Sequence, residues 1–443
     1  MRIAYITAGA GGMYCGTCLQ DNTLAAALME RGHEVSLTPT YTPMRTDEDS
    51  VAVDRIFFGA VNVYLQQKLN LFRHTPRFLD RLLDNRRLLG WVAKLGAAST
   101  NARMLGELTL SMLQGEEGKQ KKELDRLAVW LEEVLHPEIV HLSFSLFSGF
   151  ARSIKQHLGV PVVCSLQGED LFLGELEEPY RTRVAQILRR RARDIDAFTV
   201  HSRYYAELMS REYGIPGDRI RVVRLGLNPE GYAAVERPAG GRAGAAGDEI
   251  VLGYLARFCP EKGAGQIIEA FRLLAEDPRL RLRLAGYLGG RDQAFYEEQK
   301  RRIAGWGLAG RVDFVGEVDR QGKIDFLSGL DVFSMPTVYR EPKGLPVLEA
   351  LAAGVPVVQP RHGAFPEWIE STGGGILVDP LSPEALAAGI RKLIEDPELR
   401  RRLGETGRAA ALSRFDHNAA ADDMLAVYRE VLGERSELEA EAV

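Results

Sequence analysis

Cysteine, long apolar runs and surplus charge are all scarce in this sequence, and each scarcity excludes a class of protein. Four cysteines among 443 residues are too few for a secreted scaffold held together by disulfides. No stretch approaches the roughly 18 apolar residues that a membrane-spanning helix needs, and the opening "MRIAYITAGAGG" lacks a signal-peptide pattern. A net charge of −5 gives no general attraction to nucleic acid. We therefore expect a globular, cytoplasmic protein.

What the sequence does contain is a regular alternation of short apolar runs and helical patterns. "RIAYIT" leads to a helical pattern at about 19–31, and "EVSLT" follows it. The same order recurs around "EIVHLS", "VPVVCSL" and "DAFTVHS", and it restarts at "EIVLGYL" after a break. Strand, helix and strand in this order predict an α/β protein whose mostly parallel sheets carry helices on both faces.

The break is a glycine-rich stretch, "ERPAGGRAGAAG", which contains no large apolar residue. This composition predicts a linker between two α/β domains. Residues 55–135 hold helical patterns and no clear strand, so we expect a helical insertion in the first domain. The predicted order is a first domain, a linker, a second domain, a C-terminal helix and a frayed tail, at 1–235, 236–247, 248–415, 416–434 and 435–443.

The first loop, "GAGGMYCGTC" at 9–18, is an incomplete dinucleotide-binding fingerprint. The pattern G-x-G-x-x-G needs glycine where Tyr14 stands. It also needs an acid near the end of the second strand, where the sequence reads "SLTPTY". Gly11 and Gly12 still let the backbone approach a ligand closely at the end of a parallel strand.

The same loop carries a C-x-x-C pair, Cys15 and Cys18. Such a pair at a helix start can have a lowered thiol pKa and act in redox exchange. A zinc or iron–sulfur site needs further ligands. The other cysteines are Cys164, in an apolar run, and Cys259, in a loop of the second domain. We expect Cys15 and Cys18 only to pack the loop, as free cysteine often does.

The second domain has two cations in one short loop, "LARFCPEKG" at 255–263. Arg257 and Lys262 follow a predicted strand and precede a predicted helix. Fixed cations beside a helix N-terminus make a site for a diphosphate. The alternative is a pair of solvated surface charges, which is the usual state of arginine and lysine in loops.

A second stretch, "EPKGLPVLEALAAGVPV" at 341–357, predicts a helix at about 346–353. Pro346 suits its first turn. The N–H groups of Gly344 and Leu345 would then be unpaired at the helix N-terminus. These groups could bind an anion.

Two carboxylates approach this predicted helix N-terminus. Glu349 lies one turn into the helix, and helical side chains lean back toward the N-terminus. Glu341 precedes the helix on the loop. We expect the two carboxylates to converge on one bound anion and to accept hydrogen bonds from sugar hydroxyls beside it.

These stretches resemble the signatures of one family, the retaining glycosyltransferases of the GT-B fold, family 4, also called group 1. Glu341 and Glu349 match its E-x7-E signature. Arg257 and Lys262 match its R-x4-K diphosphate motif. Further matches keep the family's order, and they are "FVGEV" at 314–318, "HGAFPE" at 362–367, "GGGILVDP" at 373–380 and, more loosely, "GG" at 11–12, "RGHEV" at 31–35 and "HS" at 201–202.

The resemblance implies two Rossmann-like domains that face each other across a cleft, with the C-terminal helix crossing back to the first domain. It also implies a hexosyltransferase-type reaction. A sugar would pass from a nucleotide-diphosphate donor to a hydroxyl of a sugar or lipid-linked acceptor, with retention at the anomeric carbon. Two alternatives stay open: a nucleotide-sugar epimerase of the same fold, and an inactive scaffold protein that binds sugar nucleotides.

The resemblance assigns the diphosphate to both domains. Arg257 and Lys262 would bind it and stabilise the leaving nucleotide. Gly344 and Leu345 would donate backbone N–H groups to the phosphates. Gly12 would approach the diphosphate from the first domain.

The resemblance assigns the sugar and ribose to the two glutamates. Glu341 would contact the donor sugar near the reacting carbon, and Glu349 would hold the ribose. The family usually has a histidine in a first-domain turn where this chain has Gln167, in "SLQGED". Glutamine can donate and accept hydrogen bonds on the acceptor side but cannot act as a general base. His141 and His201 could compensate, although each position is also typical of a structural histidine.

We expect no cofactor and no essential metal, because the two loop cations and the helix N-terminus supply positive charge. The acidic patterns "DID" at 194–196 and "DED" at 47–49 lack further ligands, and we interpret them as solvated loops. Basic runs at 68–94 and 181–193 leave two interpretations open. They are either solvated helix faces or a surface for an anionic or lipid-linked acceptor, with peripheral contact to a membrane.

Overall fold

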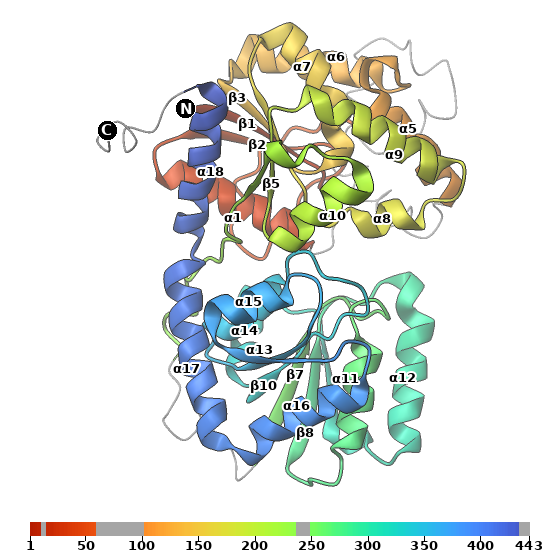
Figure 1. The fold of residues 1–443 in the computed structure, drawn as a ribbon, viewed down its shortest axis with the longest axis vertical. Coiled ribbons are helices and arrows are strands. Elements are labelled where there is room, and N and C mark those ends of the chain that lie inside the picture. The colour runs from red at the N-terminus through yellow and green to blue at the C-terminus, as the bar shows by residue number, and fades with distance from the viewer. Residues whose placement is uncertain (10–14, 59–101, 236–248, 434–443) are drawn as a thin grey trace. The chain divides into compact units, whose positions relative to one another are not determined.

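The computed structural model describes residues 1–9, 15–58, 102–235 and 249–433. The chain divides into two compact units. Unit 1 contains Met1–Gly226 and Asn418–Val443, and unit 2 contains Leu227–His417. In each unit, helices lie on both faces of a parallel sheet (Figure 1). The α/β class and the parallel sheets predicted from the sequence are thus confirmed.

Unit 1 is built on a six-stranded parallel sheet with the order β2-β1-β3-β4-β5-β6. Its strands are β1 (Arg2–Thr7), β2 (Glu34–Pro39), β3 (Ile139–Leu142), β4 (Val162–Ser165), β5 (Ala197–Val200) and β6 (Ile220–Val222). Every residue of β1 after Arg2 is buried, as are all residues of β3, β4 and β5. Burial on both faces is what helices on both sides of a parallel sheet require.

The helices of unit 1 alternate with these strands. They are α1 (Gly16–Glu30), α5 (Ala102–Gln114), α6 (Lys121–Trp130), α7 (Ala151–Leu158), α8 (Asp170–Glu175), α9 (Tyr180–Arg191), α10 (Arg203–Tyr213) and α18 (His417–Leu432). The described part of the predicted insertion is helical, since α5, α6 and a π-helical turn at Leu131–Leu135 occupy most of it.

Several sequence predictions fall outside the described residues. They concern the linker at 236–247, the tail at 435–443, Gly12 and the basic run at 68–94.

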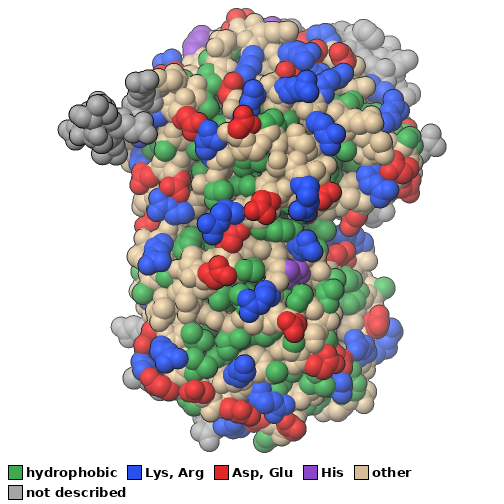
Figure 2. Space-filling view, in the orientation of Figure 1, with side chains coloured by type: hydrophobic (Ala, Val, Ile, Leu, Met, Phe, Trp, Pro, Cys, Tyr) green, Lys and Arg blue, Asp and Glu red, His purple; other side chains and the backbone are tan. Residues whose placement is uncertain are grey.

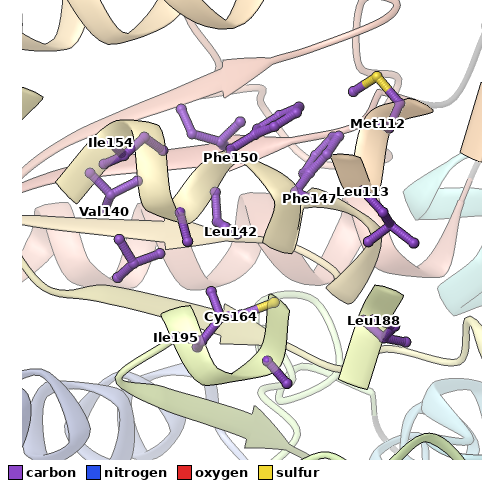
Figure 3. Packing of buried hydrophobic residues seen from close by; sticks show 14 of the residues in the cluster. Met112, Leu113, Val140, Leu142, Phe147, Phe150, Ile154, Cys164, Leu188 and Ile195 are labelled. Carbon is purple, nitrogen blue, oxygen red and sulfur yellow. The ribbon is translucent and has the colours of Figure 1, made fainter. Parts of the chain in front are cut away.

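The insertion contributes to the core of unit 1. Met112 and Leu113 of α5 are buried in one cluster with residues of the sheet and of α7. Figure 3 shows these side chains together with Val140, Leu142, Phe147, Phe150, Ile154, Cys164, Leu188 and Ile195. Fully burying such a side chain stabilises a fold by about 1.5–3 kcal/mol. The described insertion helix α5 is therefore part of the structural core.

The C-terminal helix α18 belongs to unit 1, although it follows unit 2 in the chain. Its residues Met424 and Tyr428 are buried in a cluster with Ile3 and Tyr5 of β1. Beside this cluster, Arg31 Nε lies 2.7 Å from Asp422 Oδ1 of α18. The contacts join the last helix to the first strand and the first helix.

Unit 2 repeats the architecture with the strand order β12-β11-β10-β7-β8-β9. Its strands are β7 (Ile250–Leu255), β8 (Leu280–Ala285), β9 (Val312–Gly316), β10 (Val332–Phe333), β11 (Val357–Pro360) and β12 (Gly375–Val378). Its helices are α11 (Ala264–Leu273), α12 (Gln293–Gly305), α13 (Arg320–Ser328), α14 (Leu345–Ala352), α15 (Phe365–Thr372), α16 (Pro383–Glu395) and α17 (Pro397–Arg414). The central strands β10 and β7 bring the loops that follow them to one edge of the sheet.

Charges of both signs are interspersed on the face of the molecule in Figure 2. In the basic run at 181–193, several arginines have acidic partners: Arg181 lies 3.0 Å from Glu178, and buried Arg191 lies 3.1 Å from Glu116. These pairs reduce the positive potential of α9, and both interpretations of the run stay open. Among the described residues, no helix is long and apolar enough to cross a membrane.

Candidate active site

The predicted site residues of unit 2 lie at the carboxyl ends of its central strands. The loop 256–263 follows β7, and the segment 334–344 follows β10. Because β7 and β10 are parallel neighbours, both connections leave from the same edge of the sheet, where α/β proteins bind ligands. The backbone joins them directly, since the N–H of Val338 donates to the carbonyl of Glu261 at 2.9 Å.

Gly263 makes this close approach possible. It turns the loop into α11 with a φ of 82°, and a Cβ at this position would lie 1.9 Å from the carbonyl oxygen of Pro336. Only glycine combines that backbone conformation with that space. The segment after β10 therefore runs directly beside Lys262.

Lys262, Tyr339 and Glu341 form one hydrogen-bonded cluster. Lys262 Nζ lies 2.8 Å from Glu341 Oε2 and also donates to the Tyr339 hydroxyl. The Tyr339 hydroxyl in turn donates to Glu341 Oε2. The structure thus brings together two of the residues that the sequence predicted, from positions far apart in the chain.

The Glu341 carboxylate is ionised at neutral pH. Its side chain is only 6% exposed, and burial alone would raise its pKa. The charge and hydrogen bond of Lys262, with hydrogen bonds from Tyr339 and the N–H of Gly344, instead hold the pKa below its ordinary value. Glu341 is therefore a fixed negative charge and not a proton donor.

The N-terminus of α14 is formed as predicted, but one of its N–H groups has a partner. Gly344 caps the helix with a φ of 75°, and Leu345 is its first residue. The N–H of Gly344, which was expected to be unpaired, donates to Glu341 Oε1 at 3.2 Å. The reason is that the loop folds Glu341 back onto the helix end, where a carboxylate is favourable.

Glu349 lies one turn further along α14 and pairs with a residue that sequence reasoning missed. Its Oε1 accepts a hydrogen bond from Lys323 Nζ of α13, and both side chains are almost fully buried. Each of the two predicted glutamates therefore has its own lysine. A lysine inside an amphipathic helical pattern gives no signal in the sequence that it will be buried beside an acid.

Arg257 shares the loop with Lys262 but has different partners. It lies 3.7 Å from Glu261 and 3.8 Å from Asp292. Its side chain is 37% exposed. The predicted pair of cations is thus one lysine bonded to Glu341 and one arginine held between two other carboxylates.

In unit 1, Gln167 follows β4 and is buried. Its Nε2 donates to Asp21 Oδ1 and to the Ser143 carbonyl, both at 2.8 Å. The Asp21 carboxylate also accepts from Tyr5 and Thr7. Both amide protons of Gln167 are therefore used inside unit 1, so this side chain has a fixed orientation.

The two histidines considered as substitutes for a catalytic histidine are both buried in unit 1. His141 is fully buried, with Nδ1 against the Tyr428 hydroxyl and Nε2 against Ser165. Burial, assisted by His201, lowers the pKa of His141 to about 3, so it stays neutral. His201 Nδ1 lies 3.3 Å from the Val223 carbonyl.

None of the four cysteines forms a disulfide in the structure. The helix α1 begins at Gly16 and not at the predicted residue 19. Cys15 therefore directly precedes the helix, and Cys18 lies buried in its first turn. Burial raises the pKa of Cys164 and of Cys259. These two thiols are therefore protonated at neutral pH.

The acidic patterns have structural partners where the structure describes them. Asp196 accepts from the N–H of Val162 and pairs with Lys155, both at 2.7 Å. Within the described ranges, no three His, Cys, Asp or Glu side chains are grouped so that they could hold a metal ion. "DID" is therefore a part of the fold of unit 1 and not a solvated loop.

Tyr339 and Asp292 are further site residues that sequence reasoning missed. Tyr339 stands two positions before Glu341, a spacing that places side chains on the same side of an extended segment. That spacing is a signal in the sequence. Asp292 comes from the loop after β8, and nothing in its local pattern indicates that it approaches Arg257.

Two family models match this chain. The glycosyl transferases group 1 model matches residues 241–410, and the glycosyl transferase 4-like domain model matches residues 22–226. The first match contains Arg257, Lys262, Glu341 and Glu349, and the second contains Gln167. Together they cover most of the chain.

Three individual proteins are similar to this chain in sequence or in fold. D-inositol 3-phosphate glycosyltransferase of Saccharomonospora viridis is 27% identical over 310 residues, which are 67% of this chain and 70% of that protein. Sucrose-phosphate synthase of Thermosynechococcus elongatus has the same fold, with a TM-score of 0.70 at 20% identity over 98% of this chain and 99% of that one. HepE of Anabaena, solved in complex with UDP, has a TM-score of 0.66 at 17% identity over 97% and 100% of the two chains.

Proposed function

The chain belongs to the group 1 glycosyltransferases, of the GT-B fold and family 4, and from that premise we propose the following reaction. The protein transfers a hexose from a nucleotide-diphosphate donor to a hydroxyl of a sugar or lipid-linked acceptor. The anomeric configuration of the donor is retained. No metal ion is needed, because the protein supplies the positive charge.

The observation that carries this proposal is the cluster of Lys262, Tyr339 and Glu341 beside the N-terminus of α14. It places an ionised carboxylate within hydrogen-bond distance of both a cation and a helix end. A sugar diphosphate needs such a combination: a positive site for its phosphates, and an acceptor of hydrogen bonds for its hydroxyls.

The cations act on the leaving group. As the bond between sugar and phosphate breaks, negative charge grows on the departing phosphate and positive charge on the sugar ring. Arg257 and Lys262 stabilise the first charge, and preorganised cations of this kind are usually the largest catalytic device in such a site. Lys262 then has two anionic neighbours, Glu341 and the diphosphate.

The carboxylates act on the sugar and on the nucleoside. Glu341, ionised and almost buried, accepts hydrogen bonds from the donor sugar and faces the positive charge near the reacting carbon. Glu349, held by Lys323, accepts from the ribose. Leu345 and Gly344 donate N–H groups to the phosphates, the latter by exchanging its bond with Glu341.

On the side of unit 1, Gln167 presents a fixed amide rather than a base. We propose that it orients a hydroxyl and takes no proton. UDP-sugars are the first donors to test, because HepE was solved in complex with UDP.

The experiment is a donor panel of UDP-, GDP- and ADP-glucose with and without simple acceptors, followed by NMR of the early product. We expect sugar transfer or slow donor hydrolysis, a product with the donor's anomeric configuration, and full activity in excess chelator. Inversion would contradict the proposed stereochemistry. Release of an epimerised nucleotide sugar would identify an epimerase, and binding without any turnover would identify a scaffold protein.

A further inference from the structure

Beside Arg257, unit 2 contains a closed ring of four alternating charges. Arg257 and Glu261 come from the loop after β7, whereas Arg291 and Asp292 come from the 3-10 turn Gly290–Asp292 after β8. One oxygen of each carboxylate faces Arg257 and the other faces Arg291. The four N–O distances, in the order Arg257–Glu261, Arg257–Asp292, Arg291–Asp292 and Arg291–Glu261, are 3.7, 3.8, 3.7 and 3.9 Å.

These are ion-pair distances and not hydrogen bonds. A direct charge-assisted N–H to carboxylate bond measures about 2.7–2.9 Å, and Arg302 reaches 2.7 Å to Glu269 in the same unit. Among the described residues, three buried atoms of the ring, Arg257 Nε, Glu261 Oε2 and Asp292 Oδ2, have no hydrogen-bond partner, although the Cys259 thiol also interacts with the Arg257 and Glu261 side chains. The carboxylates thus orient the Arg257 guanidinium by charge but do not use its Nε–H.

Asp292 is the most buried member of the ring, since the side chains of Glu261 and Arg291 are 35% and 59% exposed. The Asp292 side chain is 7% exposed, whereas that of Arg257 is 37% exposed. The two loops are joined by a hydrogen bond of 2.8 Å from the N–H of Phe258 to the carbonyl of Tyr287. A Cβ at Gly289 would lie 3.1 Å from Asp292 Oδ2, so the turn packs closely around this carboxylate.

We propose that Asp292 is a positioning residue that acts through Arg257. It holds the guanidinium, whose Nε is buried, at the edge of the sheet, so that the exposed part of this side chain can meet an oxygen of the donor's diphosphate. Glu261 and Arg291 complete the ring and keep its net charge at zero. The proposal rests on the proposed function, because it assigns the ring to the leaving diphosphate of the same reaction.

A positioning role for Asp292 predicts a different effect of mutation from the one that a loss of structure would produce. The variant Asp292→Asn removes a negative charge close to the phosphate site, so binding of an anionic nucleotide does not weaken. Turnover falls, because Arg257 is no longer held where charge develops in the transition state. A residue with a merely structural role would lower affinity, turnover and melting temperature together.

The test measures kcat with the donor that the panel identifies, and UDP affinity by calorimetry. GDP or ADP replaces UDP if that is the nucleotide bound by the unaltered protein. For Asp292→Asn we expect kcat to fall at least tenfold and the nucleotide Kd to stay within threefold or to tighten. Asp313→Asn is the matched control, because Asp313 pairs with Arg283 at 3.2 Å but is 60% exposed; it should change neither quantity by more than twofold.

A double variant decides whether Asp292 acts through Arg257. In an Arg257→Gln background, Asp292→Asn should lower kcat by less than a further twofold. An equal fold-loss in both backgrounds, or nucleotide affinity lost in parallel with kcat, would overturn the proposal. If Asp292→Asn does not fold, Asp292→Glu is measured in its place. We expect the same fall in kcat with retained nucleotide affinity, because the extra methylene displaces the carboxylate that holds Arg257.

The single variant Arg257→Gln separates this inference from the proposed function. If Arg257→Gln alone transfers sugar at the unaltered rate, the assignment of Arg257 to the diphosphate fails. If Arg257→Gln is slow and Asp292→Asn retains full turnover, the assignment stands and only the positioning role of Asp292 fails.

Discussion

The two units share one architecture, a six-stranded parallel sheet between helices, and differ in strand order and in the chemistry of their strand ends. In unit 2, the loops after the central strands bring together opposite charges: Lys262 with Glu341, and Lys323 with Glu349. Every one of these pairs is buried or half-buried. The carboxyl edge of this sheet is therefore an electrostatic site.

The same edge of unit 1 is held by neutral donors. The Asp21 carboxylate accepts from the Tyr5 and Thr7 hydroxyls and from the Gln167 amide. His141, neutral and stacked on Tyr5 at 4.2 Å between ring centroids, extends this network. The network consists of short hydrogen bonds between buried groups.

Charged pairs in unit 2 and neutral donors in unit 1 suit the same architecture to two different tasks. A lysine paired with a carboxylate can exchange part of that pairing for a phosphate, because both partners are anionic. A buried carboxylate whose oxygens already accept from neutral donors is held rigidly and offers no cation to a phosphate. We infer that unit 2 binds and activates the donor, and that the carboxyl edge of unit 1 keeps a fixed shape.

The largest effect should come from the loop cations of unit 2. Lys262→Ala or Arg257→Ala removes a stabiliser of the departing phosphate, which costs about 3–4 kcal/mol in comparable sites. We expect kcat to fall by about 10²–10³, with little change in the acceptor KM. Lys300→Ala, at a lysine over the Tyr296 ring on α12, is the control. Unaltered turnover in both cation variants would remove the main support for the proposed chemistry.

The fold of the site was predictable because it depends on local patterns. The strands β1 and β7 and the helix α14 lie where apolar runs, Pro346 and Gly354 predict them. No helix was predicted where α13, α15, α16 and α17 lie, and α17 contains Gly404 and Gly407, although glycine disfavours helices. Gly407 in this helix allows a close approach, since a Cβ there would lie 2.9 Å from the Cα of Gly374.

The pairing within the site was not predictable, because it depends on tertiary contacts. The sequence indicated that Lys262 and Glu341 are functional, but their 2.8 Å contact joins segments from different strands. The burial of Lys323 beside Glu349 depends on how α13 packs on α14. Motif spacing identifies residue types for a reaction, and only packing decides which of them meet.

The two glutamates of unit 2 should separate catalysis from binding. Glu341→Gln should reduce transfer strongly with near-normal nucleotide affinity. Glu349→Gln should mainly weaken nucleotide binding and also leave Lys323 buried without its charge partner, which costs about 3–5 kcal/mol of stability. Calorimetry with free nucleotide and thermal melts measure the two effects. The opposite assignment of the two phenotypes would mean that their roles are exchanged.

A smaller effect concerns acid stability and belongs to unit 1. His141 has a pKa of about 3 in the folded state against an ordinary 6.5, so the unfolded state binds more protons between these values. Stability from this residue is fully present above pH 6.5 and is lost as pH falls toward 3, by up to about 5 kcal/mol.

Denaturant titrations between pH 7 and pH 4 measure that loss, with His141→Gln as the comparison. The variant should be less stable at neutral pH, since its hydrogen bonds change, but its stability should fall less steeply with acid. Parallel curves for the two proteins would show that His141 does not stay neutral in the folded state.

The smallest effect should come from the C-x-x-C pair of unit 1. We expect Cys15→Ser with Cys18→Ser to keep most activity under reducing conditions, because Cys18 packs in the first turn of α1. Elemental analysis of the purified protein should find no stoichiometric metal. Bound zinc or iron, or lost activity with an intact fold, would assign a chemical role to the pair.

Hydrogen exchange with and without nucleotide tests the contrast between the units most directly. The protein is exchanged with saturating UDP, GDP or ADP, and peptides from both units are compared by mass spectrometry. We expect the strongest new protection in 255–263 and 341–352 of unit 2, and we expect Lys262→Ala to reduce it. Protection confined to peptides around Asp21 and Gln167 in unit 1, or no protection with any of the three nucleotides, would contradict it.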